Sequence, residues 1–127
     1  MKWSYLCLLI AGVLPLVCAG IAKSGVKGYD NHNPRAWMKQ LTGYRQRADA
    51  AQANSLEAFP FFASGVLLAL HAGVSAGRVD ALAMAFVVAR LVYIALYLAD
   101  KASLRSLVWV VGILCVVALH VSALLAV

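Results

Sequence analysis

Four long apolar stretches dominate the sequence and limit what it can fold into. They cover about residues 3–22, 54–74, 79–98 and 107–127. Each is long enough to cross the ~30 Å hydrocarbon core of a bilayer, which takes about 20 helical residues. None shows the period-2 alternation of a barrel strand, so helices are the expected spanning structure. The sequence therefore predicts an all-α membrane protein, a four-transmembrane-helix bundle in which residues 1–127 form a single domain.

The composition favours a membrane protein over a soluble one. Hydrophobic residues make up 64% of the chain and charged residues 13%, whereas soluble domains are about 45–50% apolar and about 25% charged. The net charge of +6 does not indicate nucleic acid binding, because the basic residues lie between the apolar stretches and form no stripe with interleaved aromatics. The three cysteines lie inside apolar stretches without any Cys/His cluster, so no metal site is expected.

The first apolar stretch has an alternative interpretation as a cleavable signal peptide. Lys2 precedes a Leu-rich core, and Val17-Cys18-Ala19 resembles a cleavage site. The stretch is longer than most signal cores, however, and three further spans follow it. These two features favour a transmembrane helix.

The basic residues of the connections predict the orientation of the bundle. The polar segment at about residues 23–47 and the link before the last span carry eight of them: Lys23, Lys27, Arg35, Lys39, Arg45, Arg47, Lys101 and Arg105. The other side has only Lys2 and Arg78. By the positive-inside rule, the basic connections are expected in the cytoplasm and both termini on the non-cytoplasmic side. The first connection is predicted to be an ordered interfacial loop with a short helix from Pro34 to Leu41.

Two polar stripes are predicted inside the membrane, one on each of two neighbouring spans. At 100° per residue, the second span places on one face Arg47, Asn54 and Glu57. The third span places on one face Arg90, Tyr93 and Tyr97. Charged groups at this depth cost roughly 2.5–3.5 kcal/mol each, so they tend to pair or to line a cavity. We therefore expect the stripes to enclose a polar cleft open to the cytoplasm, with Arg105 and Ser106 at its mouth. Alternatively, Glu57 and Arg90 neutralise each other and simply hold the two helices together.

Small residues recur every four positions on the same two spans. They are Gly65, Ala69 and Gly73, and then Ala81, Ala85 and Ala89. Because small side chains allow close approach of helices in lipid, both sets are expected to lie at helix contacts.

One stretch of the second span resembles a known family signature. The run Arg47-Ala48-Asp49-Ala50-Ala51-Gln52-Ala53-Asn54-Ser55-Leu56-Glu57-Ala58-Phe59-Pro60-Phe61-Phe62 resembles the Arg-Ala, Asn-x-x-Glu and aromatic-Pro pattern of the MAPEG family. These are membrane-associated proteins in eicosanoid and glutathione metabolism. Asn33-Pro34-Arg35, Arg90-x-x-Tyr93-x-x-x-Tyr97 and Arg105-Ser106 are similar to its bacterial branch. The resemblance covers all four spans.

The resemblance implies a homotrimer in the bacterial inner membrane, with left-handed four-helix subunits. Glutathione, as cosubstrate, would bind between neighbouring subunits near the cytoplasmic face. Arg47, Asn54 and Glu57 match positions that bind glutathione in the family, and Arg90, Tyr93 and Tyr97 match positions that line its site. Arg105 matches the arginine that supports the thiolate, with Ser106 beside it.

The sequence departs from the family pattern at three positions. Gln46 stands where an acidic residue is expected, Ala50 where a second arginine is expected, and Ala53 directly before the Asn. Three functions therefore stay open. The first is a glutathione transferase or peroxidase acting on a lipophilic electrophile or hydroperoxide from the bilayer. The second is a non-catalytic trimeric protein that binds a small anion, a lipid or a partner protein. The third, a small transporter or channel component, is weakly supported because few charges lie within the spans.

Overall fold

The computed structural model describes residues 1–127 and is helical apart from its turns and the irregular connections on either side of its short second helix. Its elements are α1 (Lys2–Lys23), α2 (Pro34–Met38), α3 (Gly43–His71), α4 (Ala76–Leu98) and α5 (Ala102–Ala126). The four long helices are each long and apolar enough to cross a membrane. The predicted fold class, an all-α bundle of four spans, is confirmed.

Two of the helices begin earlier than the hydropathy pattern predicted. Helix α3 starts at Gly43 rather than near residue 54, and α5 starts at Ala102 rather than near residue 107. With 29 residues, α3 is about 43 Å long, more than the ~30 Å of a hydrocarbon core. Its first turns therefore extend into the interfacial region. The short helix predicted from Pro34 is present as α2, with Pro34 at its first position and its end at Met38 rather than Leu41.

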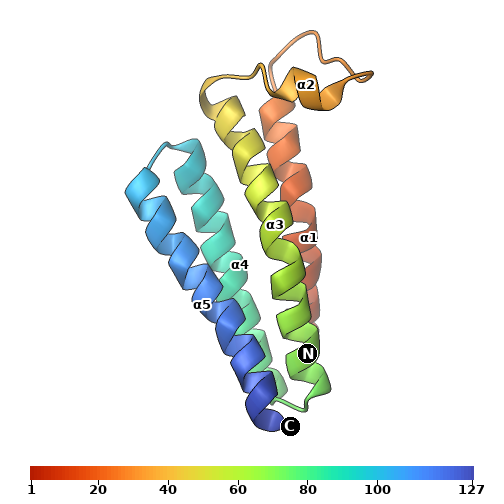
Figure 1. Cartoon of the computed structure of the whole chain (residues 1–127), viewed down its shortest axis with the longest axis vertical. Helices are drawn as coiled ribbons and strands as arrows, with labels where there is room; N and C mark the ends of the chain where they lie inside the picture. The colour runs from red at the N-terminus through yellow and green to blue at the C-terminus, as the bar shows by residue number, and fades with distance from the viewer.

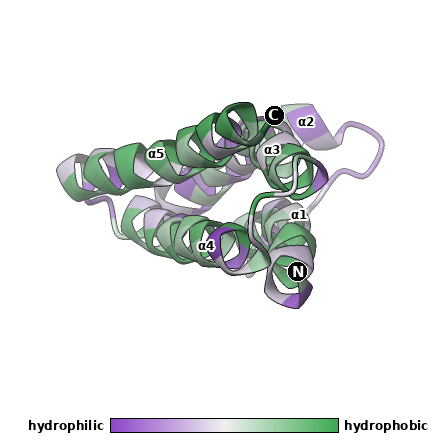
Figure 2. Cartoon of the chain, turned by 90° about the horizontal axis from the view of Figure 1, so that it is seen from below, coloured by the Kyte–Doolittle hydropathy of each residue, from purple (hydrophilic) through white to green (hydrophobic).

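The four spans form two antiparallel pairs, α1 with α3 and α4 with α5. Figure 1 shows that the pairs lie closest at the end carrying both termini and diverge toward the end carrying α2 and the α4–α5 turn. The basic connections thus share one end of the bundle. Large hydrophobic side chains such as Leu16, Leu67 and Leu114 are exposed on the long helices, whereas α2 and its flanking loop are hydrophilic (Figure 2). A surface of this kind is suited to contact with lipid.

The main hydrophobic core lies in the half of the bundle near the termini. All four spans contribute to it, and Phe62 of α3 stacks on Phe86 of α4 with ring centroids 4.0 Å apart. A second cluster lies nearer the basic end, and its buried residues come only from α1, α3 and α4: Leu14, Cys18, Ala51, Tyr93 and Ile94. Helix α5 therefore leaves the core as it approaches the basic end, where it diverges from α3.

The small-residue prediction holds for only part of each set. Gly65 and Ala69 are buried. A Cβ added at Gly65 would lie 2.9 Å from the ring of His120 on α5. Gly73, by contrast, ends α3 in a turn with a φ of +80° and is exposed.

On α4 the predicted small-residue face is largely wrong. Ala81 and Ala85 are exposed, and among the three alanines only Ala89 is buried. The buried small residue of the preceding turns is Ala83. Helix α4 instead packs into the main core through larger side chains, those of Val79, Phe86 and Val87.

The close contact at Gly65 gives a stability prediction. Gly65→Val should destabilise the protein by about 1–3 kcal/mol, because the larger side chain must displace His120 and part of α5. Gly20→Val is the matched control, since a Cβ at Gly20 meets nothing within 4 Å. Thermal unfolding in detergent measures both variants. Equal melting temperatures for the two would contradict the close α3–α5 contact.

Candidate functional site

The candidate site is built around Arg90, which lies in the interior of α4 and is only 4% exposed. One Nη donates to Asn54 Oδ1 at 2.7 Å, and the other donates to Ser55 Oγ at 3.0 Å. The guanidinium also lies over the ring of Tyr93, 4.2 Å from its centroid. Arg90 thus joins α4 to α3 through two hydrogen bonds, and both acceptors are uncharged.

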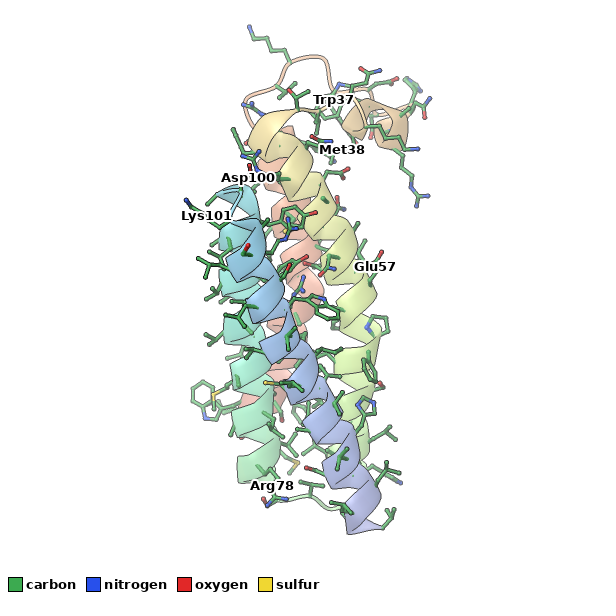
Figure 3. The ribbon with its side chains drawn as sticks, turned by 60° about the vertical axis from the view of Figure 1, so that its left-hand side comes forward. Trp37, Met38, Glu57, Arg78, Asp100 and Lys101 are labelled. Carbon is green, nitrogen blue, oxygen red and sulfur yellow. The ribbon has the colours of Figure 1, made fainter.

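The alternative in which Glu57 and Arg90 neutralise each other is wrong. Glu57 is exposed and makes no ion pair, and it lies partway along α3 between the two ends of the bundle (Figure 3). The physical reason is the rotation of α3: Ser55 and Glu57 are two residues apart and so lie about 200° apart around the helix. Since Ser55 is buried toward α4, the Glu57 side chain does not point at the guanidinium, although it reaches the cavity beside Arg90 from an exposed position. The single ion pair of the chain joins the Met1 ammonium to Asp80 at the opposite end.

Aromatic contacts connect Arg90 to the basic end. Tyr93 packs edge-on against Tyr97, with ring centroids 5.7 Å apart. The Arg105 guanidinium, from the first turn of α5, lies 4.1 Å from the Tyr97 centroid. Two arginines and two tyrosines therefore form a continuous row from inside the membrane span to the α4–α5 turn.

Arg47 has a different role from the other arginines. Its Nε and Nη2 donate to the carbonyl of Leu98 at 3.2 and 3.1 Å. Leu98 is the last residue of α4, where carbonyls lack partners within the helix and carry partial negative charge. Arg47 therefore ties the start of α3 to the end of α4.

A cavity of about 160 Å³ opens between α3, α4 and α5 beside Arg90. Four of the residues predicted from the sequence line it: Asn54, Glu57, Arg90 and Tyr93. The other four, Arg47, Tyr97, Arg105 and Ser106, do not line the cavity and lie nearer the basic end. Ser106 is exposed and takes part in none of the contacts described.

Sequence reasoning missed two kinds of residue at this site. Ser55, the buried second acceptor of Arg90, was not singled out, although it directly follows the motif residue Asn54. The wall contributed by α5, which includes Trp109 and Gly112, was also missed. A helical signal was present, because Trp109 is four residues after Arg105 and so lies on the same face of α5.

The electrostatics of the cavity favour an anion. Arg90 faces it as a buried cation, and no carboxylate of the chain forms an ion pair with it. A charged group in the interior of a membrane span is costly and is commonly compensated by a partner or a ligand. Glu57 offers a separate negative group for a cationic substituent. No group of three or more His, Cys, Asp or Glu side chains is placed to hold a metal ion.

Fold and site together define a four-span membrane protein in which a buried arginine faces a cavity between three of the helices. The model of the MAPEG family matches residues 4–125, so the chain belongs to that family. No curated protein and no solved structure matches it.

The hydrogen bonds of Arg90 give a second stability prediction. Asn54→Ala should destabilise the protein by about 1–3 kcal/mol, because it leaves a buried guanidinium donor without an acceptor. Arg90→Met should be close to neutral or stabilising, since it removes the buried charge itself. Gln52→Ala, at a half-buried residue with no side-chain hydrogen bond, is the control for truncation on α3. Chemical unfolding in mixed micelles measures the three variants. A larger loss in Arg90→Met than in Asn54→Ala would contradict this description of the site.

Proposed function

We propose that the protein binds glutathione at the Arg90 cavity and acts as a glutathione transferase or peroxidase on a lipophilic electrophile or hydroperoxide. The observation that carries this proposal is the buried Arg90 guanidinium, which is hydrogen-bonded only to neutral groups and faces a cavity. Membership of the MAPEG family makes glutathione the first ligand to consider.

The residues present suit the functional groups of glutathione. Its two carboxylates match arginine, which can hold a carboxylate through two parallel hydrogen bonds. Arg90 is the residue for one of them. Glu57, exposed and unpaired at the same cavity, suits the ammonium group. Asn54 and Tyr93 line the same cavity and add further polar atoms to it.

Arg105 is the candidate catalytic residue. Glutathione supplies a thiol, and a positive group close to sulfur lowers the thiol pKa and raises the thiolate population. Arg105 lies at the basic end of the row that starts at Arg90, held over Tyr97. Ser106 follows it in the chain and is exposed toward the same end.

We propose that a neighbouring copy in a homotrimer completes the cavity. At about 160 Å³ it is smaller than the roughly 300–1,000 Å³ of typical small-molecule sites. A tripeptide would therefore extend beyond the wall that one chain provides, and a neighbouring copy would complete the site. The apolar side chains on the cavity wall, Phe61, Trp109 and Ile113, would accept a lipophilic substrate entering from the bilayer.

The second candidate function is a non-catalytic anion-binding protein of the same trimeric form. The contacts of Arg47 favour this second candidate. Its Nε and Nη2 atoms already donate to the Leu98 carbonyl, so they do not point at a ligand. The second motif arginine is absent, with Ala50 in its place. The site therefore has fewer free cations than the family pattern implies.

Glutathione binding and turnover separate the two candidates. For the detergent-solubilised protein, we expect calorimetry to detect binding at millimolar glutathione or below, and conjugation of a generic electrophile to be measurable. Arg90→Met should abolish binding, whereas Arg105→Ala should retain binding and lose most turnover. Arg78→Ala, at the opposite end, is the control.

Two outcomes would contradict the enzyme proposal. If no binding is detected at millimolar glutathione, glutathione is not the ligand of this protein. If glutathione binds but is not turned over, the second candidate function is favoured. Turnover unchanged in Arg105→Ala would remove the role given to that arginine.

We also propose that the basic end faces the cytoplasm of a bacterial cell and that both termini lie outside. The eight basic residues at the α2 end, against Lys2 and Arg78 at the other, support this orientation. In a background with the native cysteines replaced by alanine, a membrane-impermeant maleimide should label Ser75→Cys in intact cells. Lys27→Cys should react only after permeabilisation. The reverse pattern would contradict the orientation.

A further inference from the structure

A histidine joins α5 to α3 at one end of the Arg90 cavity, and we propose that its protonation controls the width of that cavity. His120 is half-buried and lies near the end of α5, in the half of the bundle where the two helix pairs lie closest (Figure 1). Two of the residues that its ring contacts, Phe61 and Val116, also line the cavity. A change at His120 therefore reaches the cavity wall through residues that it touches.

Three polar contacts surround the imidazole ring of His120. Its Nδ1 lies 2.9 Å from the carbonyl oxygen of Val116, and its Nε2 lies 3.2 Å from the hydroxyl oxygen of Ser64. The Ser64 hydroxyl lies 3.0 Å from the carbonyl oxygen of Phe61. Because a carbonyl oxygen can only accept, Nδ1 must carry a proton, and the single hydroxyl proton of Ser64 can serve only one of its two neighbours.

Only the doubly protonated ring turns all three contacts into hydrogen bonds. When Nε2 has no proton, Ser64 donates either to that nitrogen or to Phe61, and the other contact is not a hydrogen bond. When Nε2 is protonated, the ring donates to Ser64 and Ser64 donates to Phe61. The phenyl ring, whose centroid lies 4.5 Å from that of the imidazole, also favours a cation. Protonation therefore adds one hydrogen bond, and the bond between α5 and α3 gains a charged donor, which makes it stronger.

The strength of this contact affects the cavity because α5 is one continuous helix. The imidazole fits closely against α3, where a Cβ added at Gly65 would lie 2.9 Å from it. Beyond this contact α5 diverges from α3 toward the basic end, and the cavity lies between them. The contact is strongest at low pH and loses its extra hydrogen bond as pH rises. We therefore expect α5 to move away from α3, and the cavity to widen, as His120 loses its proton.

No charged group of α3 pairs with His120. The titratable side chains on the Ser64 face of α3 are Glu57 and His71, seven residues before and after Ser64. Two helical turns place each of them about 10 Å from Ser64 along the axis. Both are exposed.

The charged groups of α4 and α5 are engaged or distant. Asp80 pairs with the Met1 ammonium at 3.0 Å. Arg78 lies at the end of the molecule (Figure 3), and Arg90 lies ten residues beyond Asp80, about 15 Å further along α4. Of the side chains that contact one another here, only the imidazole changes charge between about pH 5 and 8.

Fluorescence of Trp109 tests the proposal, because this residue belongs to the cavity wall contributed by α5. In a Trp3→Phe/Trp37→Phe background it is the only tryptophan. It lies eleven residues from His120, about 16 Å along the helix, so the imidazolium cannot quench it by contact. We expect acrylamide quenching of Trp109 in the detergent-solubilised protein to increase as pH rises from about 5 to 8. The measurement uses no glutathione, so its result is separate from the test of the proposed function.

Single substitutions in this background identify the group responsible. His120→Gln should abolish the pH dependence of quenching. His71→Gln and His32→Gln, which replace the other two histidines, are the matched controls and should retain it. Ser64→Ala removes the acceptor of the protonated Nε2 and should move the midpoint to lower pH by about one unit. Ser122→Ala, at a half-buried serine of α5 with no side-chain hydrogen bond, should leave the midpoint unchanged.

Three results would overturn the proposal. Quenching that is constant, or that decreases as pH rises, would mean that protonation does not narrow the cavity. A pH dependence that persists in His120→Gln, or is lost equally in His71→Gln, would mean that another group is responsible. An unchanged midpoint in Ser64→Ala would mean that the hydrogen bonds at Ser64 do not couple to protonation. Circular dichroism of each variant checks that it keeps its helical content.

Discussion

The burial of one guanidinium between two helices determines most of what is distinctive in this bundle. Arg90 reaches from α4 to Asn54 and Ser55 on α3, and these bonds use two of its five N–H donors without neutralising its charge. The fold keeps α3 and α4 in contact at this level while α5 moves away, so the charge faces a cavity. A fold selected only for stability would place an apolar residue here, because a buried charge rarely improves stability by itself.

The two halves of the bundle have different physical character. Near the termini, all four helices share a close-packed apolar core that includes the Phe62–Phe86 stack. Toward the basic end the core shrinks, and polar contacts such as Arg47 to the Leu98 carbonyl take over the joining of helices. The Arg90 cavity lies where the two halves meet, since Phe86 and Val116 of the main core line it together with Arg90 and Tyr93.

The fold class could be predicted from the sequence because lipid imposes a simple rule of length and hydropathy on each span. The first residues of α3 and α5 could not be predicted in this way. Hydropathy indicates where a helix enters the lipid, whereas a helix begins where its backbone hydrogen bonds begin. The sequence predicted polar residues on the faces of α3 and α4, and it did not predict which side chains of α3 accept hydrogen bonds from Arg90. Helical periodicity places Asn54, Ser55 and Glu57 within one turn, and only the packing of α3 against α4 decides which of them faces the guanidinium. The glutathione roles of these residues stay predictions.

The central claim is that a bound anion meets the buried charge of Arg90. An electron cryomicroscopy map of the protein in lipid nanodiscs with glutathione tests it most directly, because both the ligand and any neighbouring copy would be visible. We expect a ligand carboxylate in contact with the Arg90 guanidinium in the cavity between α3, α4 and α5. A map in which that cavity is closed, or in which a protein carboxylate from any copy pairs with Arg90, would contradict it.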